Sequence, residues 1–544
     1  MKKGKVFTTL LSSMLVLSLA AGCGNSATNS QTPTPSPSQS TGTETQTPTD
    51  ENPYADPIHF SGTGLAELSE GVDYSNDAIY QTLSQKFNFT YELYPMTWDN
   101  WGEKNRLWIS SGDMPDLTFW DFNYTEYKNY AEQGLIRALP DGWEAKYPNL
   151  NAVVEATGIK DKITFDGKIY ALPKPVFMHF APLSESISHT SVYYRADWVK
   201  ELGLEPFGDT VTVDELASFI NAAKTADLDG HGSGKTIGIT ANYNNAVSMF
   251  VSQKNKGWNS FYKKDGKYVW GPAQPETLEG IKLLKKYYDM GLLDPDFYLN
   301  DAKENRNKFA SGISAITYDD GTIDNLNNRI KEFAAANPDK DAASAIGLTT
   351  LVGEDGKWHG LGGANFWCAS VFSPTMSEEK MDRILSLYDY LASKEGQELV
   401  GLGIEGTDWE RTADGYKLLR SANADGTIPL LKTVYPSAAF WYLLVILPDD
   451  FSFADPTADP AVVDQVVNMY NVKKDNGDIQ PYDYDFQFYS SDAKSNYSVA
   501  TADEIVRIVM LPNADIDAEW AKFIDAQKGM VNPLLDELNS AFGK

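Results

Sequence analysis

Hydrophobic and polar positions alternate along this chain with two different periods from residue 58 onward. Phe89–Tyr94 alternates every second residue, as a strand does, whereas Asp77–Phe87 places its apolar residues at helical intervals. The predicted elements, in order, are strand 58–60, helix 77–87, strand 89–94, helix 98–110 ending at Gly112, and strand 117–120. Strands that alternate with helices indicate α/β lobes with buried sheets.

Two longer helices are predicted further along the chain. Thr375–Glu378 resembles a capping box, and the residues after it place one apolar face on a helix: Met381, Ile384, Leu385, Tyr388 and Leu391. Residues 276–290 form an amphipathic helix that Gly291 ends. The α/β pattern therefore continues past the middle of the chain, and we find no internal repeat.

The first 22 residues are patterned as a signal peptide. Three lysines precede the apolar run Val6–Ala21, which would extend only about 24 Å as a helix, less than the ~30 Å of a bilayer core. The run ends in Leu19–Cys23, which resembles a bacterial lipobox, although Ala20 stands at its usual leucine position. This resemblance implies cleavage before Cys23 and a thioether-linked diacylglycerol, with palmitate among the acyl chains. A plain secretion signal is the alternative.

Residues 23–57 are rich in Thr, Pro and Ser and poor in apolar side chains. Such a segment cannot bury enough apolar surface to fold. We therefore expect a disordered linker that holds the folded part away from the membrane.

Length, charge and cysteine count restrict the classes of protein. The 544 residues exceed one typical core, so two or more lobes are expected. The net charge of −29 repels phosphate backbones and anionic headgroups, which excludes nucleic acid and leaves the lipid anchor as the only membrane contact. Only Cys368 remains beside Cys23, in an apolar run that predicts a buried, inert thiol.

The motifs that could indicate catalysis or metal binding are weak. Gly401–Gly406 matches GxGxxG, but a predicted helix precedes it where a dinucleotide fold needs a strand. Asp227 and Asp229 match the first two positions of a calcium loop, but His231 and Lys235 stand where later oxygen ligands belong. A glycine-rich turn is favoured there, and calcium binding stays open. We expect no catalytic residue, no cofactor and no metal.

Several segments together resemble the extracellular solute-binding protein family 1 of ABC importers, and most closely its larger LplA-like lipoproteins of Gram-positive bacteria. The most specific is Ser111–Leu117, which carries a G-D-x-P-D turn between a helix and a buried strand. The other matching segments, in order, are 130–139, 166–173, 192–204 and 401–406. The resemblance covers roughly residues 58–440.

The resemblance implies an α/β fold of the two-lobed, type II Venus-flytrap kind, with a ligand cleft between the lobes. Crossings near Ser191, Asn365 and Ala424 would divide the chain. Residues 58–190 plus 366–424 would form the N-terminal lobe, and residues 191–365 plus 425–544 the C-terminal lobe. Closure would trap the ligand, and a lipid-anchored monomer on the outer face of the cell membrane would deliver it to the permease subunits.

The candidate ligand-binding residues either follow the ends of predicted strands or are aromatic residues that could stack on a sugar. Tryptophans would stack on the apolar faces of sugar rings, Asp and Asn would hydrogen-bond hydroxyls, and Arg195 would pair with a carboxylate or hold a hydroxyl. The predicted set is Trp98, Trp101, Trp120, Asp121, Asn123, Arg195, Trp258, Tyr318, Asp319, Asn365, Trp367 and Trp441. For each tryptophan, core packing is the competing interpretation.

The function that these features favour is an oligosaccharide receptor feeding an ABC importer. Three alternatives stay open: the same fold binding a peptide or other small solute, a surface lipoprotein glycoside hydrolase, and a sensor that presents its ligand to a membrane kinase. The chain has enough carboxylates for a hydrolase pair, but no spacing singles one out.

Overall fold

The computed structural model describes residues 54–65, 74–97, 100–175, 187–413, 415–421, 428–429, 431–444 and 459–543. The folded unit runs from Asn52 to Lys544. The predicted signal peptide, Cys23 and residues 24–53 of the predicted linker lie outside the described residues. So does Trp98.

The first sheet has the strand order β2-β1-β3-β15-β6. Its strands are β1 (Ile58–Leu65), β2 (Phe89–Met96), β3 (Leu117–Trp120), β6 (Ala171–Pro175) and β15 (Phe366–Phe372). β1 runs parallel to β2 and β3, whereas β15 is antiparallel to β3 and β6. The carboxyl ends of β1, β2, β3 and β6 therefore meet at one edge, where β15 begins. We call this the carboxyl edge of the first sheet.

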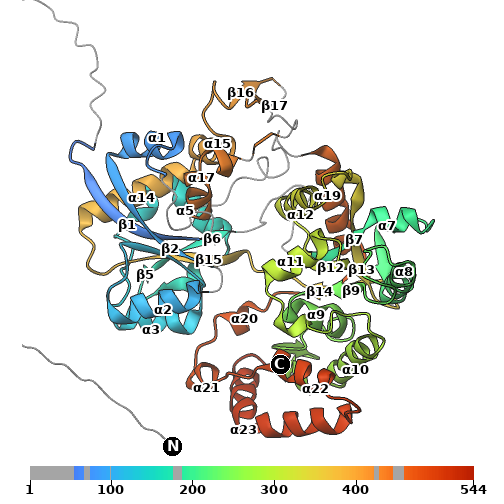
Figure 1. Ribbon diagram of the computed structural model, residues 1–544. Coiled ribbons are helices and arrows are strands. Elements are labelled where there is room, and N and C mark those ends of the chain that lie inside the picture. Colours follow the sequence, from blue (N-terminus) through green and yellow to red (C-terminus); the bar gives the residue numbers. More distant parts are fainter. Residues whose placement is uncertain are drawn as a thin grey trace, which may run out of the picture. The chain divides into compact units, whose positions relative to one another are not determined.

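Helices cover both faces of the first sheet (Figure 1). On one side lie α2 (Trp101–Ser111) and α3 (Tyr124–Glu132), and on the other α1 (Ala78–Phe87), α14 (Glu378–Ala392) and α17 (Ser437–Leu444). The remaining elements of this part are α4 (Trp143–Lys146), α5 (Pro148–Ala156), α6 (Lys160–Ile163), α15 (Lys394–Leu402), α16 (Leu431–Val434), and the hairpins β4 (Thr164–Phe165)–β5 (Lys168–Ile169) and β16 (Trp409–Thr412)–β17 (Gly415–Leu418).

The second sheet has the order β8-β13-β7-β12-β9. Its strands are β7 (Thr190–Arg195), β8 (Thr210–Thr212), β9 (Ile237–Thr240), β12 (Ser314–Asp320) and β13 (Ile346–Val352). Only β7 is antiparallel to its neighbours, so the carboxyl ends of the other four strands share an edge with the start of β7. This is the carboxyl edge of the second sheet.

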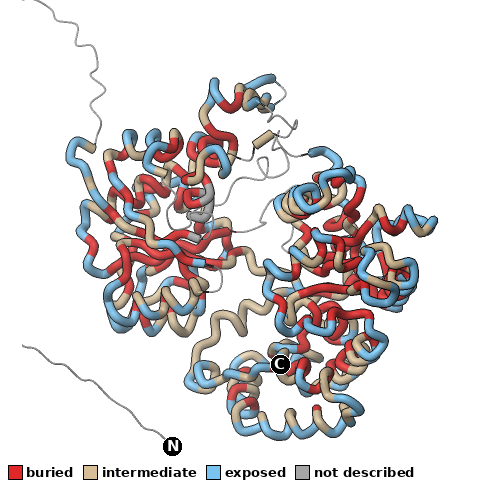
Figure 2. Tube along the Cα trace, viewed as in Figure 1, coloured by how far each residue is buried: buried red, intermediate tan, exposed pale blue. Residues whose placement is uncertain are grey.

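Alternate side chains of β7 face two different hydrophobic cores, one on each side of the second sheet. Val192 and Tyr194 pack into a core with the helices α8 (Val213–Ala226), α9 (Tyr243–Val251), α10 (Pro275–Asp289) and α22 (Thr501–Met510). Tyr193 instead joins a core with α11 (Ala302–Ala310), α12 (Ile323–Ala336), α13 (Ala342–Ala345) and α19 (Pro460–Asp475). Figure 2 shows buried residues gathered along the strands of each sheet and exposed residues on the outer parts of the helices.

The long helix α23 (Ile516–Phe542) covers the hairpin of β10 (Phe261–Lys264) and β11 (Lys267–Trp270). The indole N–H of Trp520 donates to the carbonyl of Pro272 at 3.1 Å. The short elements of the second part are α7 (Ala196–Glu201), η1 (Gly271–Ala273), η2 (Phe297–Leu299), α20 (Tyr484–Gln487) and α21 (Asp492–Ser495).

A two-stranded parallel sheet includes a strand that falls, in the sequence, between the last strand of the second sheet and β15 of the first. β14 (Trp358–Leu361) follows β13 and pairs with β18 (Gly477–Gln480), and β15 of the first sheet comes next. Beyond β18, Tyr484 and Phe488 pack against the core of the first sheet. The Tyr484 hydroxyl also accepts from the backbone N–H of Asn365 at 3.0 Å.

The elements predicted from periodicity are confirmed, with small shifts at their ends. Strand β3 has the predicted bounds, α1 begins after the N-cap Asp77, and α2 ends at Gly112 in the left-handed conformation. One cap was assigned wrongly. The side chain of Ser377, not Thr375, accepts from the N–H of Lys380, while Thr375 contacts the Ser373 hydroxyl.

Two predicted boundaries were wrong. Tyr54 was placed in the disordered linker, but its ring packs against Phe87 at 5.5 Å and lies under the guanidinium of Arg383 at 4.4 Å. Helix α17 was placed in the C-terminal lobe, but its residues Phe440 and Trp441 belong to the core of the first sheet. Their apolar side chains pack on Phe89 and Tyr91 of β2. The predicted crossing near Ala424 lies outside the described residues.

Candidate functional site

Two tryptophans from distant parts of the sequence meet at the carboxyl edge of the first sheet. Trp101 opens α2, and Trp367 stands at a register shift near the start of β15. Their ring centroids lie 5.8 Å apart, and the ring of Phe119 packs against both, at 5.4 and 5.2 Å. Both indoles are half-buried, so each keeps exposed aromatic surface. Such surface suits the apolar face of a sugar ring.

A carboxylate pair lies at the same edge. Asp121 directly follows β3, and Glu126 lies in the first turn of α3. Arg106 of α2 donates to both, through Nε to Glu126 at 2.7 Å and through Nη2 to Asp121 at 3.4 Å. Burial raises the pKa of Asp121, and the nearby Arg106 opposes that shift. Asp121 Oδ1 and Glu126 Oε2 are buried and have no hydrogen-bond partner within the described part of the chain.

Asn123, also predicted as a ligand residue, caps a helix. Its side-chain oxygen accepts from the N–H of Glu126 at 3.1 Å and closes the first turn of α3. The residue is otherwise exposed.

A lysine that the sequence analysis missed lies beside the tryptophan pair. Lys174 of β6 is buried, and its ammonium lies 5.7 Å from the centroid of the Trp367 ring. Burial lowers its pKa to about 8. The sequence signal that could have identified it is a lysine within the otherwise apolar strand Ala171–Pro175. The neighbouring Cys368 is fully buried, as predicted, and burial raises the pKa of its thiol.

The second sheet also presents polar groups at its carboxyl edge, where β12 ends. Tyr318 is buried, and burial raises the pKa of its hydroxyl. Burial likewise raises the pKa of Asp319, although Arg329 lies 3.6 Å away. Asp320 Oδ1 lies 3.3 Å from His189 Nε2. Both predicted residues, Tyr318 and Asp319, therefore lie at a strand end of the kind where α/β folds bind ligands.

Lys473 was also missed, and it braces the chain just before β7. Its ammonium donates to the carbonyls of Ser188 and Thr190 at 3.0 and 2.8 Å, and it lies 5.1 Å from the ring of Trp358. The side chain is fully buried, which lowers its pKa to about 7. The helical spacing of α19 gave no sign of this role.

Several predicted ligand residues are core residues instead. Trp120 and Trp441 are fully buried, and Trp258 is 4% exposed, so their rings offer no face to a ligand. Arg195 is 1% exposed, and its Nε and Nη2 atoms donate to the carboxylate of Asp197 at 2.8 and 2.6 Å. Its guanidinium also stacks on Trp198 and Phe333, so it stabilises the start of α7 rather than a ligand carboxylate.

The segment that begins at Asp227, where a glycine-rich turn was favoured over a calcium loop, is a hydrogen-bonded turn. Asp227 ends α8 with a φ of 56°, and its Oδ1 accepts from the N–H of Gly232 at 2.7 Å. Asp229 Oδ1 accepts from the N–H of His231 at 3.2 Å. Across the described ranges, no group of three or more His, Cys, Asp or Glu side chains is arranged to hold a metal ion.

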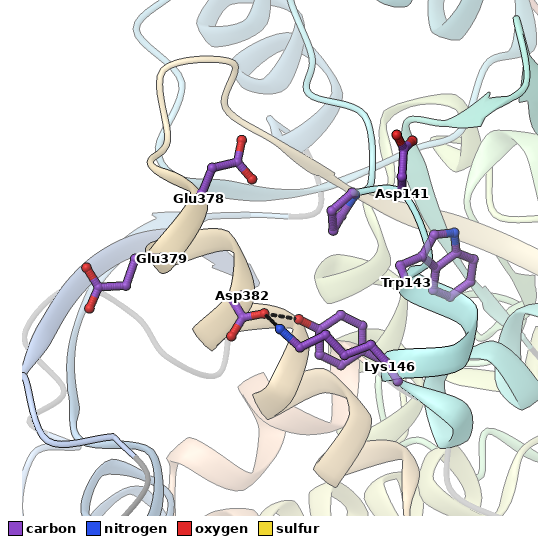
Figure 3. A pocket seen from close by; sticks show the side chains of 8 residues that line it. Asp141, Trp143, Lys146, Glu378, Glu379 and Asp382 are labelled. Atoms are coloured by element: carbon purple, nitrogen blue, oxygen red, sulfur yellow. Dashed lines mark hydrogen bonds and ion pairs between the residues drawn. The ribbon is translucent and has the colours of Figure 1, made fainter.

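A surface pocket of about 410 Å³ lies between α4 and the start of α14 (Figure 3). Its acids include Asp141, Glu378, Glu379 and Asp382, and the Lys146 ammonium and the Tyr147 hydroxyl both donate to Asp382. Helix α14 follows the end of β15, which pairs with the beginning of β3. The pocket therefore lies at the edge opposite the tryptophan pair.

A second pocket, of about 400 Å³, lies beyond the ends of β8, an edge strand of the second sheet, and its neighbour β13. Thr212 and Val352 end these strands and line it together with Gln253, Tyr287 and His359. None of the predicted ligand residues lines either pocket.

The sequence matches the family of bacterial extracellular solute-binding proteins over residues 78–401, more than half of the chain. The chain belongs to this family, and the predicted resemblance to solute-binding proteins is confirmed. Among the described residues, no helix combines the length and apolar character needed to cross a membrane.

The chain is similar in sequence to two curated relatives and in fold to one solved structure. The polygalacturonan/rhamnogalacturonan-binding protein YtcQ of Bacillus subtilis is 24% identical over 312 residues, 56% of this chain and 58% of the relative. The fructooligosaccharide ABC transporter substrate-binding protein FusA of Streptococcus pneumoniae is 28% identical over 217 residues, 38% of this chain and 40% of the relative. The chain thus spans less than two thirds of either.

The crystal structure of the alginate-binding protein AlgQ2 superposes with a TM-score of 0.66 at 15% identity, covering 90% of this chain and 98% of that chain. At this identity the likeness concerns the fold alone. It confirms the predicted two-lobed α/β fold of solute-binding proteins.

Proposed function

We propose that this protein is a lipid-anchored receptor on the outer face of the cell membrane that binds an oligosaccharide between its lobes. It delivers the oligosaccharide to the permease subunits of an ABC importer. The observation that carries the proposal is the pair Trp101 and Trp367, which share a half-buried aromatic surface beside Asp121 at the carboxyl edge of the first sheet. Crevices at such edges are where open α/β sheets bind ligands.

The chemistry of this edge supports a sugar over a peptide. Exposed indole surface matches the apolar C–H face of a pyranose ring, and the Asp121 and Glu126 oxygens that have no partner among the described residues accept from its hydroxyls. YtcQ and FusA, both named for carbohydrates, support the same ligand class. Asp319 and Tyr318, at the matching edge of the second sheet, are proposed to face the ligand from the other lobe.

The protein acts by binding and release, not by catalysis. Asp121 and Glu126 both accept from the guanidinium of Arg106, and we assign them as hydrogen-bond acceptors for sugar hydroxyls rather than as an acid and nucleophile pair. The lipobox-like Leu19–Cys23 supports the anchor, and the protein works as a monomer that closes around its ligand. The domain boundaries at 191 and 365 are proposed as the hinge crossings.

The proposal is tested by thermal-shift and calorimetric titration of residues 24–544 against plant and microbial oligosaccharides, with di- and tripeptides as a second panel. A ligand that binds only the folded state adds about 2.7 kcal/mol at a hundredfold excess over Kd. We expect a shift with at least one oligosaccharide and its recovery intact by chromatography. Cleavage of the sugar, or shifts with peptides alone, would overturn the proposal.

A further inference from the structure

We infer that the site at the first sheet's carboxyl edge takes a neutral oligosaccharide and discriminates against one that carries uronic acid carboxylates. This inference rests on the proposed function and narrows it to one substrate class. It follows from the charges and the unpaired acceptors that surround the tryptophan pair.

The first observation is an excess of negative charge at the edge. Asp121 and Glu126 share the single guanidinium of Arg106, so one negative charge of this trio remains uncompensated. The side chains of Asp121 and Glu126 are only 37% and 28% exposed, so solvent screens this charge incompletely. A ligand carboxylate placed here meets like charge in a poorly screened setting, which disfavours its binding.

The second observation is the kind of hydrogen bond that the edge still requires. Asp121 Oδ1 and Glu126 Oε2 are buried acceptors without partners in the described part of the chain. An ionised carboxylate only accepts hydrogen bonds, so a uronate group cannot satisfy either oxygen. A sugar hydroxyl donates, and it is the group that a neutral oligosaccharide offers at every ring.

The third observation is that the cations described at the carboxyl edges of the two sheets have other partners. Arg329, at the second sheet's edge, interacts with Asp319 and Glu332, and Lys473 donates to two backbone carbonyls. Lys174 lies beside the tryptophan pair, but it is buried against Trp367, and desolvation lowers its pKa to about 8. Arg106, the arginine beside Trp101, already donates to Asp121 and Glu126, so a ligand carboxylate would have to compete with both for its guanidinium.

Gly102 lets the start of α2 pack closely against Arg106 and Asp121. A methyl group at its Cβ position would lie 3.0 Å from Arg106 Nη1 and 3.5 Å from Asp121 Oδ2. The residue next to Trp101 therefore packs directly against the Arg106–Asp121 contact. The aromatic surface and the carboxylates form one continuous site.

The test uses pairs of oligosaccharides with the same linkage and length that differ only in oxidation at C6, such as galactotriose with trigalacturonate and maltotriose with its C6-oxidised form. Calorimetric titration of residues 24–544 is expected to show at least tenfold tighter binding of the neutral member. Asp121→Asn removes the uncompensated charge and should reduce that ratio at least threefold. Asp113→Asn removes an exposed acid from the turn before β3 and should leave the ratio unchanged.

The outcomes separate this inference from the proposed function. Tighter binding of the oxidised member overturns the inference while leaving an oligosaccharide receptor in place. A neutral preference that Asp121→Asn does not change also overturns it, because the discrimination then arises elsewhere. Absence of binding by any oligosaccharide, neutral or oxidised, overturns the proposed function and the inference together.

Discussion

The indole rings of Trp101 and Trp367 lie 5.8 Å apart at the carboxyl edge of the first sheet, although one belongs to the first half of the chain and the other to the second. The contact depends on the antiparallel insertion of β15 between β3 and β6, which returns the chain to this sheet after it has built the second one. The aromatic surface of the proposed site is therefore a product of the crossing topology.

Replacing either tryptophan should weaken ligand binding more than it weakens the fold. We expect Trp101→Ala and Trp367→Ala each to raise the Kd of the best oligosaccharide about tenfold, since one stacking contact contributes about 0.5–1.5 kcal/mol beyond its buried area. Because the rings touch, the double variant should lose less than the sum of the two single losses. Calorimetric titration measures all three values.

Leu107→Ala is the matched control for this pair. Leu107 lies on α2 as Trp101 does, but its side chain is 65% exposed and it belongs to none of the cores. Its replacement should leave the Kd unchanged. Equal losses for Leu107→Ala and Trp101→Ala would show that a general disturbance of α2, not lost stacking, explains the effect.

Arg195 should be essential for stability and dispensable for ligand affinity. Removing one member of a buried ion pair costs about 3–5 kcal/mol, because the partner charge stays behind. We expect Arg195→Met to lower the thermal midpoint, because Asp197 then keeps only the more exposed Lys340 as its cation, while the Kd of the protein that remains folded is unchanged. A selective loss of binding at an unchanged midpoint would restore Arg195 as a ligand residue.

The sequence predicted secondary structure well where local signals are strong. Gly112 adopts a φ of 76°, which a glycine tolerates best, and it ends α2 at the predicted residue. Asp77 accepts from the N–H groups of Ile79 and Tyr80 and starts α1. Such caps act within a few residues, so a local pattern is sufficient to find them.

The sequence could not separate the site tryptophans from the core tryptophans. Phe119 and Trp120 are neighbours on β3 and face opposite sides of a sheet that helices cover on both sides, so both positions are apolar. Only the tertiary structure shows that Trp120 is fully buried while Trp101 keeps exposed surface. The pairing of Arg106 with Glu126 likewise needs α2 and α3 to pack together.

The buried thiol should be unreactive in the folded protein. Cys368 is fully buried, and burial raises its thiol pKa, so little thiolate is available to attack a reagent. In a chain that begins at Gly24, we expect no labelling by a maleimide under native conditions and one label per chain in guanidinium chloride, counted by mass spectrometry. Rapid native labelling would show that the edge beneath Trp367 opens to solvent.

Cys23 should determine where the protein resides. If the lipobox-like segment is processed as proposed, Cys23→Ala will release the protein from the membrane fraction into the medium, because no described helix could hold it there. Detergent phase partitioning of cells that express each form measures the change. Membrane retention of the variant would require a different anchor.

The buried ammonium of Lys473 should make stability depend on pH in a way that identifies it. Its pKa falls from 10.5 in the unfolded chain to about 7 in the folded one, so between these values the unfolded chain binds more protons. The free energy of unfolding should therefore rise as the pH increases from about 7 to 10, by up to about 1.4 kcal/mol per pH unit.

Lys473→Met removes this contribution, so its stability relative to the unchanged protein should fall as the pH rises across this range. Lys474→Met, an exposed neighbour on α19, should run parallel to the unchanged protein in the same denaturant titrations. A parallel curve for Lys473→Met as well would mean that water reaches the ammonium and that it does not brace the Ser188 and Thr190 carbonyls as a buried group.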